Sequence, residues 1–304
     1  MSGLRPHAQA VADALARIAL RFPLLERILV AGTRSPALRR HLRLGAVALG
    51  YPRVLHRRDV RIAEMDGYRF HVNVGESLGV GPYFFGDSGT VWLTRSLIGA
   101  GDVCVDAGAN AGHYTFLCAS VVGLQGRIFA FEPNPEFVSL LRRSVALNGF
   151  EKIVEVNTRA LWSSSGESKR FYVSTEPTNT GTSSLVDHGW FVSRAHSIEV
   201  QTLRFDDFAL QAGLEHFRLV KIDVERAEDS VLEGAQRTLA ERRIDYLIVE
   251  MHHGSRASDL LSAAGYRGYL LIPERRELLA LSNVSKDSFG DFLYVRPGLS
   301  PPAG

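Results

Sequence analysis

From about residue 100 onward, short apolar runs alternate with segments in which apolar positions recur at helical spacing. The short runs are rich in β-branched and aromatic residues, and most are followed by Gly, Asp or Pro, so each predicts a strand that ends in a turn. The predicted strands cover residues 103–105, 128–131, 153–156, 219–222, 246–249 and 292–295. This alternation predicts an α/β fold with a mostly parallel, doubly wound sheet and helices on both faces. Because ligands of such sheets bind beyond the carboxyl ends of the strands, the residues after each run are candidates for a functional site.

An apolar stripe at helical spacing precedes this region. Its members are Val11, Leu15, Ile18, Phe22, Leu25 and Leu29, and Pro23 is expected to divide the stripe into two helices. Residues 1–61 also hold 12 arginines against three acids, a net charge of +9, whereas the rest of the chain carries −7. The contrast predicts a basic helical N-terminal extension, residues 1–61, and a main domain, residues 62–304. The extension is interpreted either as a cap packed on the main domain or as a basic surface for anionic lipid or a lipid-linked substrate.

The composition of the whole chain is that of a soluble globular protein. It has 304 residues, of which 45% are hydrophobic and 22% are charged. Its two cysteines, Cys104 and Cys118, have no partner at metal-ligand spacing and are expected to be buried apolar side chains. The first residues lack a secretory signal pattern, and no apolar run approaches the roughly 18 residues of a membrane span. These features predict a cytoplasmic protein.

The first predicted strand leads into a glycine-rich segment, Asp106-Ala-Gly-Ala-Asn-Ala-Gly112, which precedes a predicted helix. Gly108 and Gly112 allow a tight turn and a close approach of a ligand, where a Cβ would collide. The segment is not the dinucleotide fingerprint G-x-G-x-x-G, because Asn110 stands where the second glycine would be. An acid at position 106 suits a cationic amine, whereas it would repel a pyrophosphate. The residues predicted to bind the ligand here are Asp106, Gly108, Ala109, Asn110 and Gly112.

The second predicted strand ends in Phe131-Glu-Pro-Asn-Pro135. Glu132 is thereby placed where a carboxylate accepts hydrogen bonds from both hydroxyls of a ribose, with Pro133 and Asn134 beside it. Together, Asp106 and Glu132 describe a ligand that has an amino-acid end and a nucleoside end. S-adenosylmethionine is such a ligand, and NAD is not.

The chain resembles the FkbM family of S-adenosylmethionine-dependent methyltransferases over roughly residues 80–275. The segments that carry the resemblance are Val105-Asp-Ala-Gly-Ala-Asn-Ala-Gly-His-Tyr-Thr115, Phe131-Glu-Pro-Asn-Pro135, Thr182-Ser-Ser-Leu185, Phe205-Asp-Asp-Phe208, Lys221-Ile-Asp-Val-Glu225 with Ala227-Glu228, and Ile248-Val-Glu-Met-His252. The resemblance implies a class I methyltransferase fold, Rossmann-like, with a seven-stranded sheet whose last strand is antiparallel. It also implies methyl transfer to a hydroxyl of a sugar, a glycolipid or a secondary metabolite.

One position departs from the family pattern, which commonly reads Lys-Ile-Asp-Val-Glu-Gly-Ala-Glu. Arg226 stands where that pattern has glycine. Either the turn has an ordinary backbone conformation here, or the arginine disturbs it, because a positive φ is costly for a residue with a Cβ. The departure concerns the shape of the acceptor pocket and leaves the fold unchanged.

Methyl transfer to an alcohol requires a base near the acceptor oxygen, because an alkanol is a poor nucleophile until it loses its proton. Asp223 ends the fourth parallel strand, where the methyl group is expected, and His252 ends the next strand. We predict Asp223 near the sulfonium or the acceptor, with Glu228 or His252 as the base. The structural alternative is that Glu225 and Glu228 enrich a helix N-terminus and that His252 serves packing.

The alternatives to a metal-free O-methyltransferase are a metal site and two other functional classes. Asp223, Glu250 and His252 would form an oxygen-rich metal site, but no second acid follows the fifth strand, so we predict no metal. Nucleic-acid methylation is suggested by the basic extension; against it, the fourth strand ends in Asp-Val-Glu instead of an Asn/Asp-Pro-Pro-Tyr-like turn, and we expect no nucleic-acid partner. A catalytically impaired donor-binding or adaptor protein is supported by Arg226 alone. The particular acceptor and the oligomeric state are not encoded in any readable motif.

Overall fold

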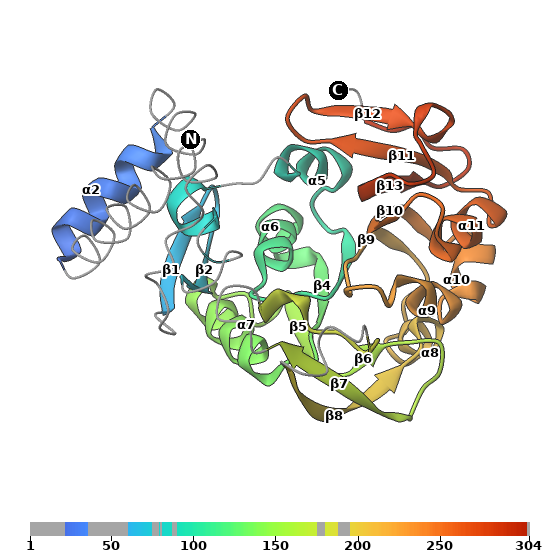
Figure 1. The fold of residues 1–304 in the computed structure, drawn as a ribbon, viewed down its shortest axis with the longest axis horizontal. Helices are drawn as coiled ribbons and strands as arrows, with labels where there is room; N and C mark the ends of the chain where they lie inside the picture. The colour runs from blue at the N-terminus through green and yellow to red at the C-terminus, as the bar shows by residue number, and fades with distance from the viewer. Residues whose placement is uncertain are drawn as a thin grey trace, which may run out of the picture.

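The computed structural model describes residues 22–35, 60–74, 79, 81–86, 90–174, 180–187 and 195–302. In these residues an eight-stranded sheet runs in the order β12-β11-β13-β10-β9-β3-β4-β5 (Figure 1). Its strands are β3 (Val103–Ala107), β4 (Arg127–Phe131), β5 (Val154–Asn157), β9 (Phe217–Ile222), β10 (Ile244–His252), β11 (Arg267–Ile272), β12 (Glu277–Ala280) and β13 (Phe289–Val295). Strands β5, β4, β3, β9 and β10 are parallel, and β13 lies antiparallel between β10 and β11.

The predicted α/β fold is confirmed, and each of the six predicted strands is present. Strand β13 is the antiparallel strand that the family resemblance implies. The sheet has one strand more than the seven of that pattern, because β12 forms a hairpin with β11 at the edge. The turn of this hairpin contains Arg276 with a φ of 53°.

Two apolar cores cover the two faces of the sheet, because successive residues of a strand point to opposite faces. Cys104 and Ile128 belong to the first core, whereas their neighbours Val105 and Phe129 belong to the second. The first core includes side chains of α5 (Val91–Leu97), α6 (His113–Val122) and α7 (Pro135–Asn148). The second includes side chains of α8 (Phe205–Gln211), α9 (Glu228–Glu233), α10 (Gln236–Ala240) and α11 (Arg256–Ala263).

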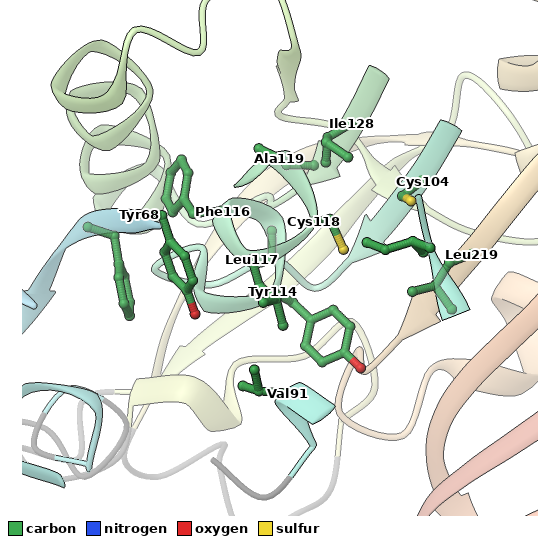
Figure 2. Close-up of a cluster of buried hydrophobic side chains, with 14 of the residues drawn as sticks. Tyr68, Val91, Cys104, Tyr114, Phe116, Leu117, Cys118, Ala119, Ile128 and Leu219 are labelled. Atoms are coloured by element: carbon green, nitrogen blue, oxygen red, sulfur yellow. The ribbon is translucent and has the colours of Figure 1, made fainter. Parts of the chain in front are cut away.

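Figure 2 shows part of the first core, between β3 and α6. Cys104 and Cys118 are both buried there and neither forms a disulfide, as predicted. Short 3₁₀ helices follow α6 at Gly123–Gln125 and precede β13 at Leu281–Asn283. None of the helices described in the structure is both long and apolar enough to cross a membrane.

A hairpin of β1 (Val60–Met65) and β2 (Tyr68–Asn73) packs against α6 and α7. The helix α2 (Pro23–Arg34) begins at the proline expected to break the apolar stripe, since proline suits a first helical position whose N–H has no partner. The Glu26 carboxylate of α2 accepts hydrogen bonds from Arg61 Nε at 2.9 Å and from the Tyr83 hydroxyl at 2.6 Å. Strand β1 thus crosses residue 61, and the domain boundary there stays a prediction.

The other part of the N-terminal stripe, which contains Val11, Leu15 and Ile18, lies outside the described residues. Tyr83 belongs to a short π-helix, η2 (Gly81–Phe85), which follows the hairpin. Arg34 donates hydrogen bonds to the carbonyl oxygens of Pro82 and Tyr83 at 3.2 and 2.9 Å. These contacts hold α2 to the segment that leads into the main sheet.

A side sheet of β6 (Ala160–Leu161), β8 (Ala195–Leu203) and β7 (Ser168–Ser174) lies next to β5 (Figure 1). Strand β7 is followed by the short 3₁₀ helix η4 (Thr180–Thr182). Ser184 forms a bridge with Tyr172 and donates from its Oγ to the Glu225 carbonyl at 2.6 Å. The side sheet therefore reaches the turn that follows β9.

Candidate functional site

A cavity of about 610 Å³ opens at the carboxyl ends of β3, β4, β9 and β10, where the strand pattern predicts a site. It is lined by several residues that the sequence singles out: Gly108, Ala109, Asn110, Glu132, Pro133 and Asp223. Its other walls come from β2, η2, β7 and the turn after β11, among them Phe70, Pro82, Phe171 and Pro273. This volume lies within the range of about 300 to 1,000 Å³ that is typical of small-molecule pockets.

The glycine loop, residues 106–112, joins β3 to α6 and brings its backbone against β9. Gly108 has a φ of +80°, and a Cβ built there would lie 1.8 Å from the Asp223 carbonyl oxygen. Gly112 has a φ of +96°, and a Cβ there would lie 2.3 Å from the ring of Phe116. Both positions therefore require glycine for conformation and for space. Gly112 does not line the cavity but directs the chain into α6.

Glu132 is buried at the end of β4 and is held by backbone amides. Its Oε2 accepts from Asn110 N and its Oε1 from Asn134 N, each at 2.8 Å. Burial raises the pKa of Glu132 to about 7, although these hydrogen bonds oppose the shift. The adjoining wall is apolar, with Phe131, Pro133 and Phe137. Asn134 lies behind this wall, where its side chain caps α7 by accepting from Glu136 N at 3.0 Å.

Asp106 lies beneath the glycine loop and is 2% exposed. Its Oδ2 accepts from the Thr115 hydroxyl at 2.6 Å, and its Oδ1 lies 3.7 Å from Lys221 Nζ. Burial raises the pKa of Asp106, whereas the positive charge of Lys221 lowers it. Asp106 is not among the residues that line the cavity, so its predicted contact with an amine stays a prediction.

Four carboxylates gather at the ends of β9, β10 and β13, and we call Asp223, Glu225, Glu250 and Asp291 the acidic cluster. Carboxylate oxygens of the first three lie within 4.8 Å of one another, and Glu250 is paired with Asp291 across β10 and β13. Lys221 Nζ lies 3.0 Å from Asp223 Oδ2 and counters part of the negative charge. Burial and the charge of Asp223 raise the pKa of Glu250 to about 8 and that of Glu225 to about 7.

The structure brings Asp223 to the cavity but not the two side chains predicted as bases. Glu228 is 8% exposed, and its Oε1 accepts from Val224 N and Arg226 N, each at 3.1 Å, so it stabilises the turn after β9. His252 is exposed, and its ring packs 5.0 Å from the ring of Phe289. Neither residue lines the cavity, and their roles as base stay predictions.

The position of His252 follows from the unequal lengths of neighbouring strands. The last pair between β9 and β10 joins Ile222 to Val249, so Glu250 is the first residue of β10 beyond that edge. His252 lies two residues further, which is roughly 7 Å along a strand. Glu250 follows the predicted strand directly and could have been found by the strand-end rule. Asp291 could not, because its place depends on the antiparallel register of β13.

Arg226 occupies a left-handed backbone conformation with a φ of 73°, next to Glu225 with a φ of 54°. Of the two alternatives, an ordinary turn is therefore wrong: the arginine adopts a conformation that favours glycine. Its side chain is exposed. The nearby amide hydrogen bonds to Glu228 show that the turn is nevertheless formed.

Replacing Arg226 with glycine is expected to stabilise the protein. A left-handed residue with a Cβ costs about 1–2 kcal/mol, and the greater freedom of glycine in the unfolded chain offsets part of the gain. We expect the free energy of unfolding to rise by about 0.5–1 kcal/mol in urea denaturation. Arg226→Ala is the control, because it removes the side chain but keeps the Cβ. A loss of stability in Arg226→Gly would contradict the interpretation.

Comparison with known proteins places these features in a family. The family model for the "Methyltransferase FkbM domain" matches residues 106–271. The chain is 28% identical over 216 residues to "Hexuronic acid methyltransferase AglP" of Haloferax volcanii, covering 67% of this chain and 79% of the relative. It is 30% identical over 133 residues to "2-O-methyltransferase NoeI" of Sinorhizobium fredii, covering 40% of this chain and 53% of that relative.

The similarity to solved structures is more distant. The Methanococcus jannaschii fibrillarin, a pre-rRNA processing protein, aligns with a TM-score of 0.40 and 12% identity over 79% of this chain and 84% of that chain. We draw no conclusion about substrate from a likeness at this level.

Proposed function

Because the chain belongs to the FkbM methyltransferase family, it is an S-adenosylmethionine-dependent methyltransferase, and we propose that its acceptor is a hydroxyl group of a sugar. The observation that carries the proposal is a single cavity with Glu132 in one part and the acidic cluster in another. Carboxylates accept hydrogen bonds from hydroxyls, of which a sugar has many. The names of two relatives, a hexuronic acid methyltransferase and a 2-O-methyltransferase, support the same acceptor class.

The donor end of the cavity has the groups that S-adenosylmethionine requires. Glu132 offers the remaining lone pairs of a fixed carboxylate to the ribose hydroxyls, beside the apolar wall of Phe131, Pro133 and Phe137. Gly108 lines this end of the cavity, and its lack of a side chain lets the glycine loop lie directly against the backbone of Asp223. Asp106, Gly112 and Asn134 support this end from behind the lining residues.

S-adenosylmethionine supplies an electrophilic methyl group bound to a positively charged sulfur. We assign Glu250 as the base that takes the hydroxyl proton of the acceptor as the oxygen–carbon bond forms and the sulfur–carbon bond breaks. Lys221 Nζ, 3.0 Å from Asp223, holds that carboxylate beside Glu250, and burial together with the negative charge of Asp223 raises the pKa of Glu250 toward the operating range of a base. The products are a methyl ether, S-adenosylhomocysteine and a protonated Glu250, which returns its proton to water.

The proposed function is tested by calorimetry and by turnover. We expect micromolar binding of S-adenosylmethionine and S-adenosylhomocysteine, and formation of S-adenosylhomocysteine when free sugars, hexuronic acids or glycolipids are added. Binding of donor without turnover on any sugar, but with turnover on a phenol or another non-sugar hydroxyl, would reject the acceptor class. Failure of the folded protein to bind either donor form would reject the whole proposal.

We further propose that the acidic cluster works without a metal, although Asp223, Glu225 and Glu250 have a geometry that a cation could use. Lys221 already counters the charge of Asp223, and the raised pKa values of Glu225 and Glu250, about 7 and about 8, reduce the negative charge of the cluster at neutral pH. Millimolar EDTA is therefore expected to leave the initial rate of transfer unchanged. Loss of activity that Mg²⁺ or Mn²⁺ restores would make the cluster a metal site.

Peripheral membrane contact through residues 1–61 is a second proposal. The helix α2 exposes Phe22, Leu24 and Ile28, which are 56%, 70% and 59% exposed, in a segment with a net charge of +9. In flotation at low salt, the protein is expected to float with vesicles that contain anionic phosphatidylglycerol. The double variant Leu24→Ser, Ile28→Ser is expected to reduce the fraction of protein that floats. Leu124→Ser is the control, since Leu124 is 81% exposed outside the extension. Equal flotation of all variants would reject the proposal.

A further inference from the structure

His113 is a partly buried residue at the edge of the cavity, and the steps above do not use it. It is the first residue of α6, immediately after the glycine loop, and it lines the cavity. Both of its ring nitrogens are buried, and neither has a hydrogen-bond partner among the residues that the structure describes. Its ring contacts those of Phe70 and Tyr68 in β2, at centroid distances of 5.5 and 6.1 Å.

The cost of this arrangement indicates a ligand. A buried polar group without a hydrogen bond destabilises a protein, and such groups are rare. A phenylalanine would fill an aromatic pocket beside Phe70 without that cost. Burial, together with the positive charge of Lys221, lowers the pKa of His113 to about 4, so the ring is neutral at pH 7. A neutral imidazole carries one N–H donor and one acceptor nitrogen.

The charges around the cavity restrict what this donor can bind. The amino-acid end of S-adenosylmethionine carries an ammonium group and a carboxylate. The acidic cluster attracts the sulfonium and the ammonium group but repels the carboxylate, which requires N–H donors on a wall without acids. His113 supplies a donor beside the aromatic rings of Phe70 and Tyr68. Lys221, which also lines the cavity, already lies 3.0 Å from Asp223 and 3.7 Å from Asp106.

From these contacts we propose that His113 donates a hydrogen bond to the carboxylate of the methyl donor and so fixes the amino-acid end of the donor in the cavity. The inference rests on binding of S-adenosylmethionine in this cavity and adds a residue specific to its carboxylate. His113 is then a binding residue for the donor, whereas Glu250 acts on the acceptor.

The test compares two donors that differ in the carboxylate alone. Calorimetry with the full-length protein measures binding of S-adenosylmethionine and of decarboxylated S-adenosylmethionine. A hydrogen bond to a charged group contributes about 1.5–3 kcal/mol, so His113→Phe should lower the affinity for S-adenosylmethionine by about 10- to 100-fold. Binding of the decarboxylated donor should change by less than about twofold, because its complex lacks that hydrogen bond. Equal losses for both donors, or no loss for either, would overturn the inference.

A matched control is available on the neighbouring hairpin. His71 lies on β2, does not line the cavity, and has its Nδ1 3.1 Å from the Ser144 hydroxyl. His71→Phe is expected to leave the affinity ratio of the two donors unchanged. His113→Asn keeps an N–H donor and is expected to recover part of the affinity for S-adenosylmethionine but to leave the decarboxylated donor unaffected.

A measurement on the wild-type protein covers the case in which the variants do not fold. Imidazole resonances of His113 are followed by NMR against pH, with S-adenosylhomocysteine and with 5′-methylthioadenosine, which lacks the amino-acid end. A carboxylate partner stabilises the imidazolium, so S-adenosylhomocysteine should raise the pKa of His113 more than 5′-methylthioadenosine does. An identical pKa with both ligands would overturn the inference, while binding of S-adenosylhomocysteine itself would leave the proposed function intact.

Discussion

Glu250→Gln is expected to lower the rate of methyl transfer by about a thousandfold, because general-base catalysis contributes roughly 10²- to 10⁴-fold. Glutamine has nearly the shape of glutamate but cannot take the hydroxyl proton of the acceptor. In the proposed arrangement the donor lies against Glu132 and the glycine loop, so the affinity for the donor should change by less than about threefold, the size expected for the loss of one neighbouring charge. The measurements are kcat at saturating donor and calorimetry with S-adenosylhomocysteine.

The dependence on pH gives a second readout for the same residue. Burial and Asp223 raise the pKa of Glu250 to about 8, and the base acts only when ionised. The wild-type rate should therefore fall as the pH falls through about 8, and Glu250→Gln should lose this dependence together with its activity. This limb would be absent if the base were a side chain with an unperturbed pKa.

Two further variants decide between the assignments. Glu274→Gln is the matched control, since Glu274 also lines the cavity but is exposed and lies in the turn after β11. It should retain the wild-type rate within about twofold, as expected of a solvated surface charge. If His252→Ala abolished transfer and Glu250→Gln did not, the base would be His252, one of the two side chains that the sequence predicts for this role.

Gly108→Ala is expected to have the largest effect on stability. A Cβ at this position would lie 1.8 Å from the Asp223 carbonyl oxygen and 2.8 Å from its carbon, both of which are backbone atoms. The ends of β3 and β9 would have to separate, and the hydrogen bond from Asp223 N to Ala107 O, 3.0 Å long, would be lost. We expect the free energy of unfolding to fall by more than about 4 kcal/mol, and donor binding to be abolished in any protein that folds.

Gly101→Ala separates the clash from the backbone conformation. Gly101 also has a positive φ, 86°, but a Cβ there would meet nothing within 4 Å. Gly101→Ala should therefore lower the free energy of unfolding by only about 1–2 kcal/mol, the cost of a left-handed conformation for a residue with a side chain. Urea denaturation of both variants measures the difference between the two positions. Similar losses would mean that the ends of β3 and β9 can move apart without cost.

Much of the fold and half of the site could be predicted from local patterns in the chain. The strands, the glycine loop, Glu132 and Asp223 follow from apolar runs and the residues that end them, because strand formation and turn chemistry depend on near neighbours in sequence. The hairpin of β1 and β2, the side sheet, β11 and β12 were not predicted. The pairing of these strands depends on partners elsewhere in the chain, so local patterns do not indicate it.

What the sequence by itself determined is the order of the six predicted strands along the chain and the edge of the sheet where the cavity lies. Those properties are local, because they follow from the spacing of apolar residues and from the Gly, Asp and Pro residues that end the strands. Only the tertiary structure decided which acids meet there. Glu250 lies at the cavity and His252 lies beyond it because β10 extends past the end of β9. Asp291 lies beside Glu250 because of the antiparallel register between β13 and β10. Register and relative strand length arise from packing between distant segments, which no local pattern records.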